Sequence, residues 1–88
     1  MKRSGDLLAM PGSTIDPTAT VKGGSCIGRN STVGAGVTIE RSIIESDATI
    51  ESGAVITDSF VAAGAHVDKW AVIASSFVTN GEILPIPR

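Results

Sequence analysis

Branched aliphatic residues recur about every six positions between Ile15 and Val78, and this spacing limits the possible folds more than any other feature of the chain. Three steps are one residue shorter, and they begin at Ile39, Ile56 and Ile73, so a period of seventeen governs the second half. A hexapeptide period is typical of a parallel β-helix, in which each short strand stacks on the strand one coil below. We call the recurring aliphatic residues rungs: Ile15, Val21, Ile27, Val33, Ile39, Ile44, Ile50, Ile56, Val61, Val67, Ile73 and Val78.

The residues between the rungs fit the corners of such a helix. A tight corner with positive φ is expected three residues after a rung, and residue types that tolerate it stand there: Gly24, Asn30, Gly36, Asp47, Gly53, Gly64 and Gly81. The next position should point into a crowded corner that only small residues fit: Ala19, Ser25, Ser31, Ala48, Ala54, Ala65 and Ala71. In the five-residue units we expect Ile43, Phe60 and Phe77 to fill an opened corner and to touch one another from coil to coil.

The pattern predicts an all-β fold, a single-stranded parallel β-helix of nearly four triangular coils over residues 15–80, with short capping segments at both ends. Residues 1–14 lack the period, and they are either an N-terminal cap, with the apolar run before Met10 folded over the first coil, or a linker from a larger protein. Glu82 would put a carboxylate at an inward corner, so the helix should end or deform at Gly81. Residues 81–88 form a C-terminal tail or cap, where Pro85 and Pro87 should prevent further ladder pairing.

Each vertical column of rungs should form one sheet face. The three columns are Ile15, Val33, Ile50 and Val67; Val21, Ile39, Ile56 and Ile73; and Ile27, Ile44, Val61 and Val78.

Composition argues against several classes of function. The net charge is −2 and the basic residues are scattered, so no basic stripe is present to follow a nucleic acid backbone. No apolar run reaches the roughly 18 residues that span a bilayer, and the first ten residues lack the apolar core of a secretion signal, which favours a soluble cytoplasmic protein. The single cysteine, Cys26, can form no internal disulfide and belongs to no metal-binding spacing.

Trp70 is the most conspicuous departure from the repeat, because the equivalent corner residues are Thr18, Gly36 and Gly53. Residues just before a rung should point outward, so an exposed apolar patch is predicted on one edge, made of Val55, Trp70, Val72 and Ala74. We expect this patch to bind another subunit or domain, because tryptophan is enriched at binding hot spots. Alternatively Leu7, Leu8, Met10 or the Ile83–Leu84 segment folds back and covers Trp70 within the chain.

Groups with catalytic potential are few. The only histidine, His66, lies in the outward position before Val67 and in line with Thr49 and Thr32. It is either a surface residue or a general base in a cleft between subunits, as in acyltransferases built on hexapeptide helices. One histidine makes no zinc site, and we predict neither a metal nor a cofactor. The glycines of residues 23–29 fit corners rather than a phosphate loop, and Glu40, Glu45 and Glu51 face solvent in different columns.

The alternation of Ile39-Glu-Arg-Ser-Ile-Ile44, Ile56-Thr-Asp-Ser-Phe-Val61 and Ile73-Ala-Ser-Ser-Phe-Val78 with hexads such as Val61-Ala-Ala-Gly-Ala-His resembles one family in particular. It is similar to the C-terminal left-handed β-helix of sugar-nucleotide pyrophosphorylases, closest to mannose-1-phosphate guanylyltransferases and glucose-1-phosphate adenylyltransferases. The similarity covers about three quarters of the chain and implies left-handed winding, an exception to the usual right-handed crossover.

The resemblance implies a non-catalytic role, because catalysis in that family belongs to an N-terminal nucleotide-binding head that this chain lacks. We therefore expect an oligomerisation or regulatory module of a sugar-phosphate nucleotidyltransferase, which assembles as a homo-oligomer and contacts a catalytic domain in cis or in trans. The chain is then either an excised domain or a separately encoded remnant. The alternatives are a free-standing acyltransferase-like protein with His66 at a subunit interface and a purely structural scaffold.

Overall fold

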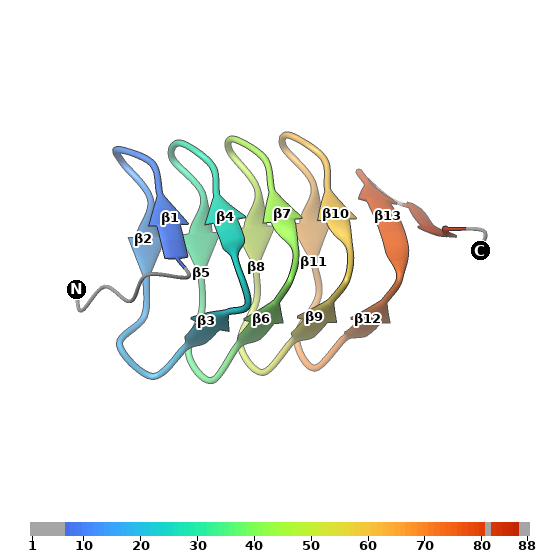
Figure 1. Ribbon diagram of the computed structural model, residues 1–88, viewed down its shortest axis with the longest axis horizontal. Helices are drawn as coiled ribbons and strands as arrows, with labels where there is room; N and C mark the ends of the chain where they lie inside the picture. The colour runs from blue at the N-terminus through green and yellow to red at the C-terminus, as the bar shows by residue number, and fades with distance from the viewer. Residues whose placement is uncertain (1–6, 81, 87–88) are drawn as a thin grey trace.

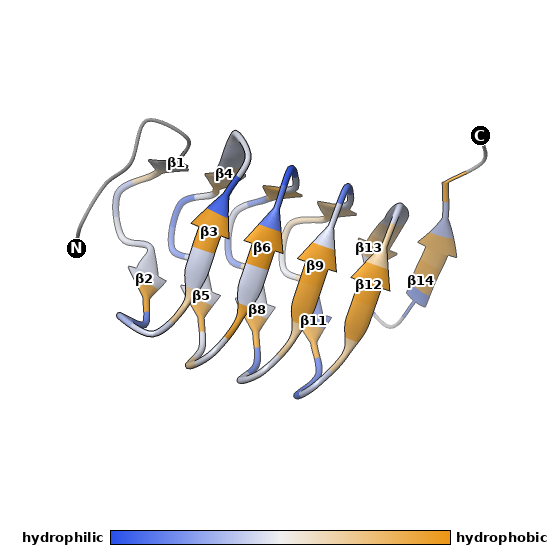
Figure 2. Cartoon of the chain, turned by 60° about the horizontal axis from the view of Figure 1, so that its bottom comes forward, coloured by the Kyte–Doolittle hydropathy of each residue, from blue (hydrophilic) through white to orange (hydrophobic). Residues whose placement is uncertain are grey.

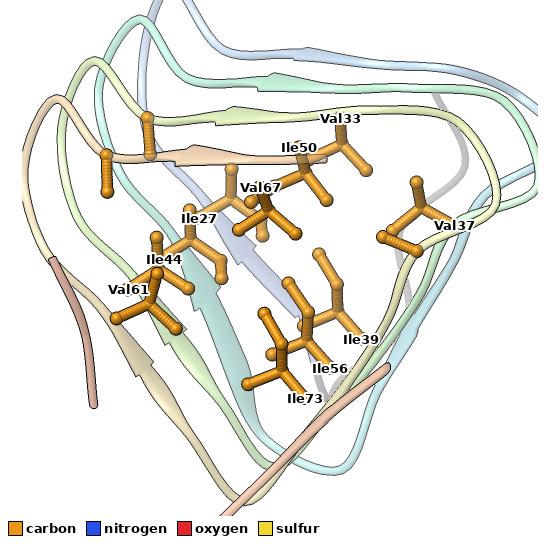
Figure 3. Close-up of a cluster of buried hydrophobic side chains, with 14 residues drawn as sticks. Ile27, Val33, Val37, Ile39, Ile44, Ile50, Ile56, Val61, Val67 and Ile73 are labelled. Carbon is orange, nitrogen blue, oxygen red and sulfur yellow. The ribbon is translucent and has the colours of Figure 1, made fainter. Parts of the chain in front are cut away.

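The computed structural model describes residues 7–80 and 82–86, and it shows a parallel β-helix wound in coils of triangular outline (Figures 1 and 3). Sheet A contains, in spatial order, β1 (Leu7–Ala9), β4 (Ser25–Ile27), β7 (Ile43–Ile44), β10 (Phe60–Val61), β13 (Ser76–Thr79) and β14 (Glu82–Pro85). Sheet B contains β2 (Thr14–Ile15), β5 (Thr32–Val33), β8 (Thr49–Ile50) and β11 (His66–Val67). Sheet C contains β3 (Thr20–Lys22), β6 (Thr38–Glu40), β9 (Val55–Thr57) and β12 (Val72–Ala74).

The strands follow one another as A, B, C, A, B, C, so four coils are complete at β12 and sheet A then receives β13 and β14. This confirms the predicted all-β fold, a parallel β-helix. No segment of the described ranges forms a helix long and apolar enough to cross a membrane.

The three predicted columns of rungs are confirmed. In sheet A, Ile27 pairs with Ile44 and Val61 with Val78, and the other two columns stack in the same way in sheets B and C. From Ile27 onward every rung is at most 2% exposed, and Figure 3 shows the side chains converging from the three faces on a common axis. The end rungs Ile15 and Val21 are only partly buried, because no complete coil covers them.

The predicted corner conformation is also confirmed where the structure describes it. Positive φ occurs at all the expected positions up to Gly64, including the non-glycine residues Asn30 (60°) and Asp47 (61°), whereas Gly81 lies outside the described residues. The expectation that only small residues fit the inward corner position is wrong at one place. Val37 occupies it and is completely buried, so the interior of that corner accommodates a branched side chain.

The five-residue units differ from the prediction. Their opened corners are filled by Ser42, Ser59 and Ser76, which are at most 6% exposed. The larger residues Ile43 and Phe77 instead lie on the outside of sheet A, 45% and 37% exposed. A five-residue unit contains its own left-handed residue, since Arg41, Asp58 and Ser75 all have φ near 50°. That turn brings the serine inward and the following residue outward.

The predicted contact between the large residues of neighbouring coils nevertheless holds. Phe60 lies opposite Ile43 on one side and Phe77 on the other, and the two phenyl rings are stacked with centroids 5.1 Å apart.

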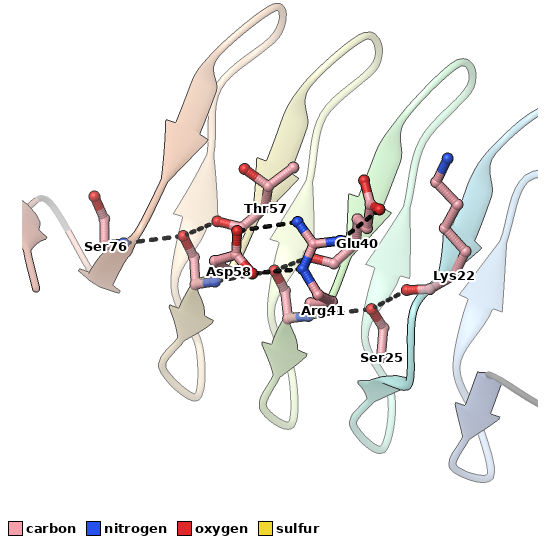
Figure 4. A network of polar contacts seen from close by, with 9 residues as sticks. Lys22, Ser25, Glu40, Arg41, Thr57, Asp58 and Ser76 are labelled. Atoms are coloured by element: carbon pink, nitrogen blue, oxygen red, sulfur yellow. Dashed lines mark hydrogen bonds and ion pairs between the residues drawn. The ribbon is translucent and has the colours of Figure 1, made fainter.

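A ladder of serine hydroxyls connects the coils at this corner (Figure 4). The backbone N–H of Ser76 donates to Oγ of Ser59 at 3.0 Å, that of Ser59 to Ser42 at 3.1 Å, and that of Ser42 to Ser25 at 3.1 Å. Each hydroxyl in turn donates to a backbone carbonyl of its own coil, as Ser59 does to Thr57 at 2.7 Å. The serines thus satisfy buried backbone donors that a shortened corner would otherwise leave without partners.

The two ends of the helix differ from each other. At the N-terminal end, β1 pairs in parallel with β4 and thereby extends sheet A before the first rung. At the C-terminal end the parallel ladder stops, but the expectation that Pro85 would prevent further pairing is wrong, while Pro87 lies outside the described residues. Strand β14 turns back and pairs antiparallel with β13, with Pro85 opposite Ser76, and the N–H of Ile86 donates to Ser75. Because an antiparallel edge strand needs only alternate donors, proline is tolerated there.

The serine ladder generates a stability prediction. Ser59→Ala removes the acceptor for the Ser76 N–H in a site that water does not reach, so we expect the free energy of unfolding to fall by about 1–3 kcal/mol in a chemical denaturation experiment. Ser46→Ala is the matched control, because Ser46 is half-buried and its hydroxyl makes none of these bonds; it should change stability by less than about 0.5 kcal/mol. Equal effects of the two substitutions would contradict a structural role for the ladder.

Candidate functional site

The three outer faces of the prism carry different side chains at the position just before each rung. Sheet B presents polar residues there: Thr14, Thr32, Thr49 and His66. Sheet C changes along its length, from Thr20 and Thr38 to Val55 and Val72. Sheet A is apolar throughout the corresponding row: Cys26, Ile43, Phe60, Phe77 and Leu84. Two of the three faces are therefore candidates for contact with another protein surface.

The Trp70 face, which we define as Val55, Trp70, Val72 and Ala74, gathers the residues that the sequence singled out. Val55 and Val72 are direct neighbours in sheet C, and Ala74 ends the same strand as Val72. Trp70 is 74% exposed and Val72 is 77% exposed, so most of this surface is open to solvent. Figure 2 shows the same gradient, because β9 and β12 are orange over most of their length whereas β3 and β6 are orange only in part.

Strand β14, which contains Ile83 and Leu84, lies in sheet A beside β13 and leaves Trp70 uncovered.

The backbone of Trp70 holds an unusual conformation for so large a residue. Its φ is 64°, in the left-handed region where a bulky side chain costs about 1–2 kcal/mol. The indole ring lies across Gly53, the equivalent corner of the preceding coil, so closely that a Cβ built on Gly53 would overlap the ring. Gly53 thus makes room for the indole, and the contact keeps the exposed ring on the surface of the helix in one place.

Sequence reasoning missed the sheet A stripe, which we define as Ile43, Phe60, Phe77 and Leu84. It placed the first three of these residues inside a corner, whereas they lie outside. The signal was present, since each of Ile43, Phe60 and Phe77 directly precedes a rung, the same rule that located Val55 and Val72 on the outer surface. The stripe runs across four neighbouring strands, from β7 to β14.

His66 lies on the polar face of sheet B, opposite Thr49 as predicted. Its Nε2 is 2.8 Å from a carboxylate oxygen of Glu51, and both side chains are partly exposed. No cluster of three potential metal ligands is found within residues 7–80 and 82–86. Gly23 and Gly24 form a corner with positive φ before β4, in agreement with the corner interpretation of residues 23–29.

Two further charged groups, Arg41 and Asp16, make exposed side-chain contacts at corners. Arg41 donates to Asp58 through Nε at 2.7 Å and to Glu40 at 2.6 Å, and the hydrogen bonds and charges of these two carboxylates raise the pKa of Arg41 (Figure 4). At the first coil, the hydroxyl and the backbone N–H of Thr18 donate to Asp16 and lower the pKa of that carboxyl. These pairs connect or close corners, and none of them lines a cleft suited to a substrate.

The coils are stacked, their aliphatic rungs recur about every six residues, and left-handed residues turn their corners. These features define a hexapeptide-repeat β-helix domain. The family model of the GMPPB C-terminal domain matches residues 3–84, and the chain belongs to that family. The match confirms the resemblance to the β-helix of mannose-1-phosphate guanylyltransferases. Comparison with curated proteins gave no significant match.

The contact between Trp70 and Gly53 can be tested with a matched pair of substitutions. Gly53 and Gly36 have similar φ, 76° and 69°, but no atom lies within 4 Å of a Cβ built on Gly36. Gly36→Ala should therefore pay only the left-handed backbone cost of about 1 kcal/mol, whereas Gly53→Ala should cost at least about 1 kcal/mol more because it displaces the indole.

Thermal unfolding would measure both variants, and Trp70, the only tryptophan, should change its fluorescence only in Gly53→Ala. An unaltered emission spectrum in that variant would show that the ring does not rest on Gly53.

Proposed function

We propose that this chain is the non-catalytic oligomerisation and regulatory module of a sugar-phosphate nucleotidyltransferase of the mannose-1-phosphate guanylyltransferase type. Membership of the GMPPB C-terminal domain family supports the parent enzyme class. One observation of the structure supports the assembly role above all others: an exposed tryptophan and an exposed valine lie side by side on an otherwise regular helix.

In this proposal the Trp70 face is the contact between subunits. Tryptophan contributes more to binding energy than most residues when a partner removes it from water, and Val55 and Val72 would surround it with apolar surface. The indole is already held against Gly53, so little conformational freedom would be lost on assembly. The polar residues Thr20 and Thr38 at the other end of sheet C would limit the contact to the last two coils.

The sheet A stripe is then the surface that packs against the nucleotidyltransferase catalytic domain, in cis or in trans. Sheets A and C are different sides of the prism, so one module could contact a second subunit and a catalytic domain at the same time. The stacked Phe60 and Phe77 rings give this stripe a rigid centre, and Ile43 and Leu84 extend it on either side. Such an arrangement would transmit a change at the subunit contact to the catalytic domain through a stiff helix.

Dissociation by mutation tests the subunit contact. Trp70→Ala and Val72→Thr should each shift the purified chain towards monomer in size-exclusion chromatography with light scattering, because both remove apolar area from the proposed contact. Val72→Thr keeps a branched side chain that sheet C already accepts at Thr38, so folding should be preserved.

The matched control is Ile43→Thr on the sheet A stripe, which should leave the mass of the isolated chain unchanged. A wild-type chain that stays monomeric at high concentration, or an assembly that only Ile43→Thr dissociates, would overturn the assignment of the Trp70 face.

A further inference from the structure

The C-terminal end of the helix is closed on one side and open on two. In sheet A, β13 is covered by the antiparallel strand β14. In sheets B and C, β11 and β12 are the last strands, and within residues 7–80 and 82–86 each has a neighbouring strand on one side only (Figure 1). Unpaired strand edges of this kind are templates for the addition of another strand.

The open edges present backbone donors that have partners in every earlier coil. Thr49 and Glu51 donate their N–H groups to Ala65 and Val67 at 2.9 Å, and Val55 donates to Ala71 at 2.8 Å. The equivalent groups one coil further on belong to His66, Asp68 and Val72. No strand of the described residues lies beyond them to accept these bonds, so the edge offers the hydrogen-bonding pattern of one further coil.

A cavity of about 160 Å³ lies at the same end. Its walls include the last rung of each column, Val67, Ile73 and Val78, together with Ala71. A cavity of about this size in an apolar protein interior holds a ligand as large as benzene, so there is room for a branched aliphatic side chain. Val67 and Ile73 are each only 2% exposed, and Ile83 of β14 also lines the cavity, so the β13–β14 hairpin already covers the last rungs and the remaining space lies beside them, next to Ala71.

The β13–β14 hairpin limits which molecules can bind at this end of the helix. If a second copy of this chain placed its β2 and β3 on β11 and β12, its β1 and β4 would coincide with β13 and β14. A complete copy is thereby excluded from continuing the helix. The two open strand edges, on β11 and β12, correspond to two sides of one coil. Two hexads, or about twelve residues, would cover them as a single bent segment.

We propose that this end of the helix is a binding site for an extended peptide segment from a partner protein, with two branched aliphatic residues six positions apart. The segment adds a parallel strand to β11 and another to β12, its carbonyls accept from His66, Asp68 and Val72, and its aliphatic side chains enter the cavity beside Ala71 and Ile83. Recognition by strand addition takes its affinity from the backbone and its selectivity from the pocket. Asp68 and Glu82 at the rim of the cavity select against acidic side chains at these two positions.

The test uses a synthetic peptide with the sequence of residues 31–42, because this stretch already forms strands of sheets B and C and carries rungs at Val33 and Ile39. Added to the full 88-residue chain, it should shift the amide resonances of His66, Asp68 and Val72 and slow their hydrogen exchange. The control peptide carries Val33→Asp and Ile39→Asp and should bind at least about tenfold more weakly, since it cannot place apolar side chains in the cavity.

Two protein variants locate the site. Ala71→Ile narrows the cavity at a position where the equivalent residue Val37 is already branched, and it should weaken binding without unfolding the helix. Ala35→Ile, at an exposed corner of an earlier coil, should bind the peptide as the wild type does.

Three results would overturn the proposal: no amide shift at millimolar peptide, equal binding of the aspartate peptide, or shifts confined to the sheet A stripe. If the three amides are protected in the free protein and lose that protection on dilution, a second copy occupies the end and the proposed partner segment is wrong.

Discussion

The contact of each aliphatic rung with the equivalent rung of the next coil, seventeen or eighteen residues away, is the interaction on which the whole molecule depends. It takes branched side chains out of water in three columns at once, and most of the rungs are almost completely buried. Because a rung touches mainly the coils above and below it, the core has the same width at every level and requires no long-range closure. A chain of 88 residues can in this way bury an apolar interior that a conventional globule of the same length would build with difficulty.

The rungs can stack only because the corners turn the chain tightly enough to close each coil. A coil closes within so few residues only because several of them take up left-handed conformations, most of them glycine, asparagine or aspartate. Where the coil loses one residue, the serine ladder replaces backbone bonds that the shorter corner could not otherwise make. The interior therefore combines apolar columns with one line of hydroxyls, and both follow the same period.

The sequence revealed those parts of the structure that repeat. The three columns and the left-handed corners at Asn30, Asp47 and the glycines were predictable because the same constraint occurs in every coil. The parts that could not be predicted are those where the repeat changes or stops. Counting forward from Ile56 places Phe60 at the inward corner, whereas counting back from Val61 places Ser59 there, and the structure follows the second count.

The path of the chain after Thr79 could not be predicted from the sequence either, because the reversal into β14 depends on local backbone geometry and not on the repeat period. Of the two candidate interaction surfaces, the sequence predicted the Trp70 face but not the sheet A stripe. Trp70 stood out because it interrupts a row of small residues, and the structure places it on the surface with Val55 and Val72. The sheet A stripe was overlooked for the same reason that Phe60 was misplaced.

The common register of all three columns also restricts how a gene for such a domain can change in length. The five-residue units show that the loss of one residue is tolerated where a left-handed residue and a buried serine rebuild the corner, whereas adding or deleting a residue within a strand would turn its aliphatic side chain away from the axis. Adding or deleting a complete turn of seventeen residues would leave each rung above an equivalent rung. Domains of this kind should therefore grow and shrink in whole turns, and the number of turns then determines how far apart the helix holds whatever is attached to its two ends.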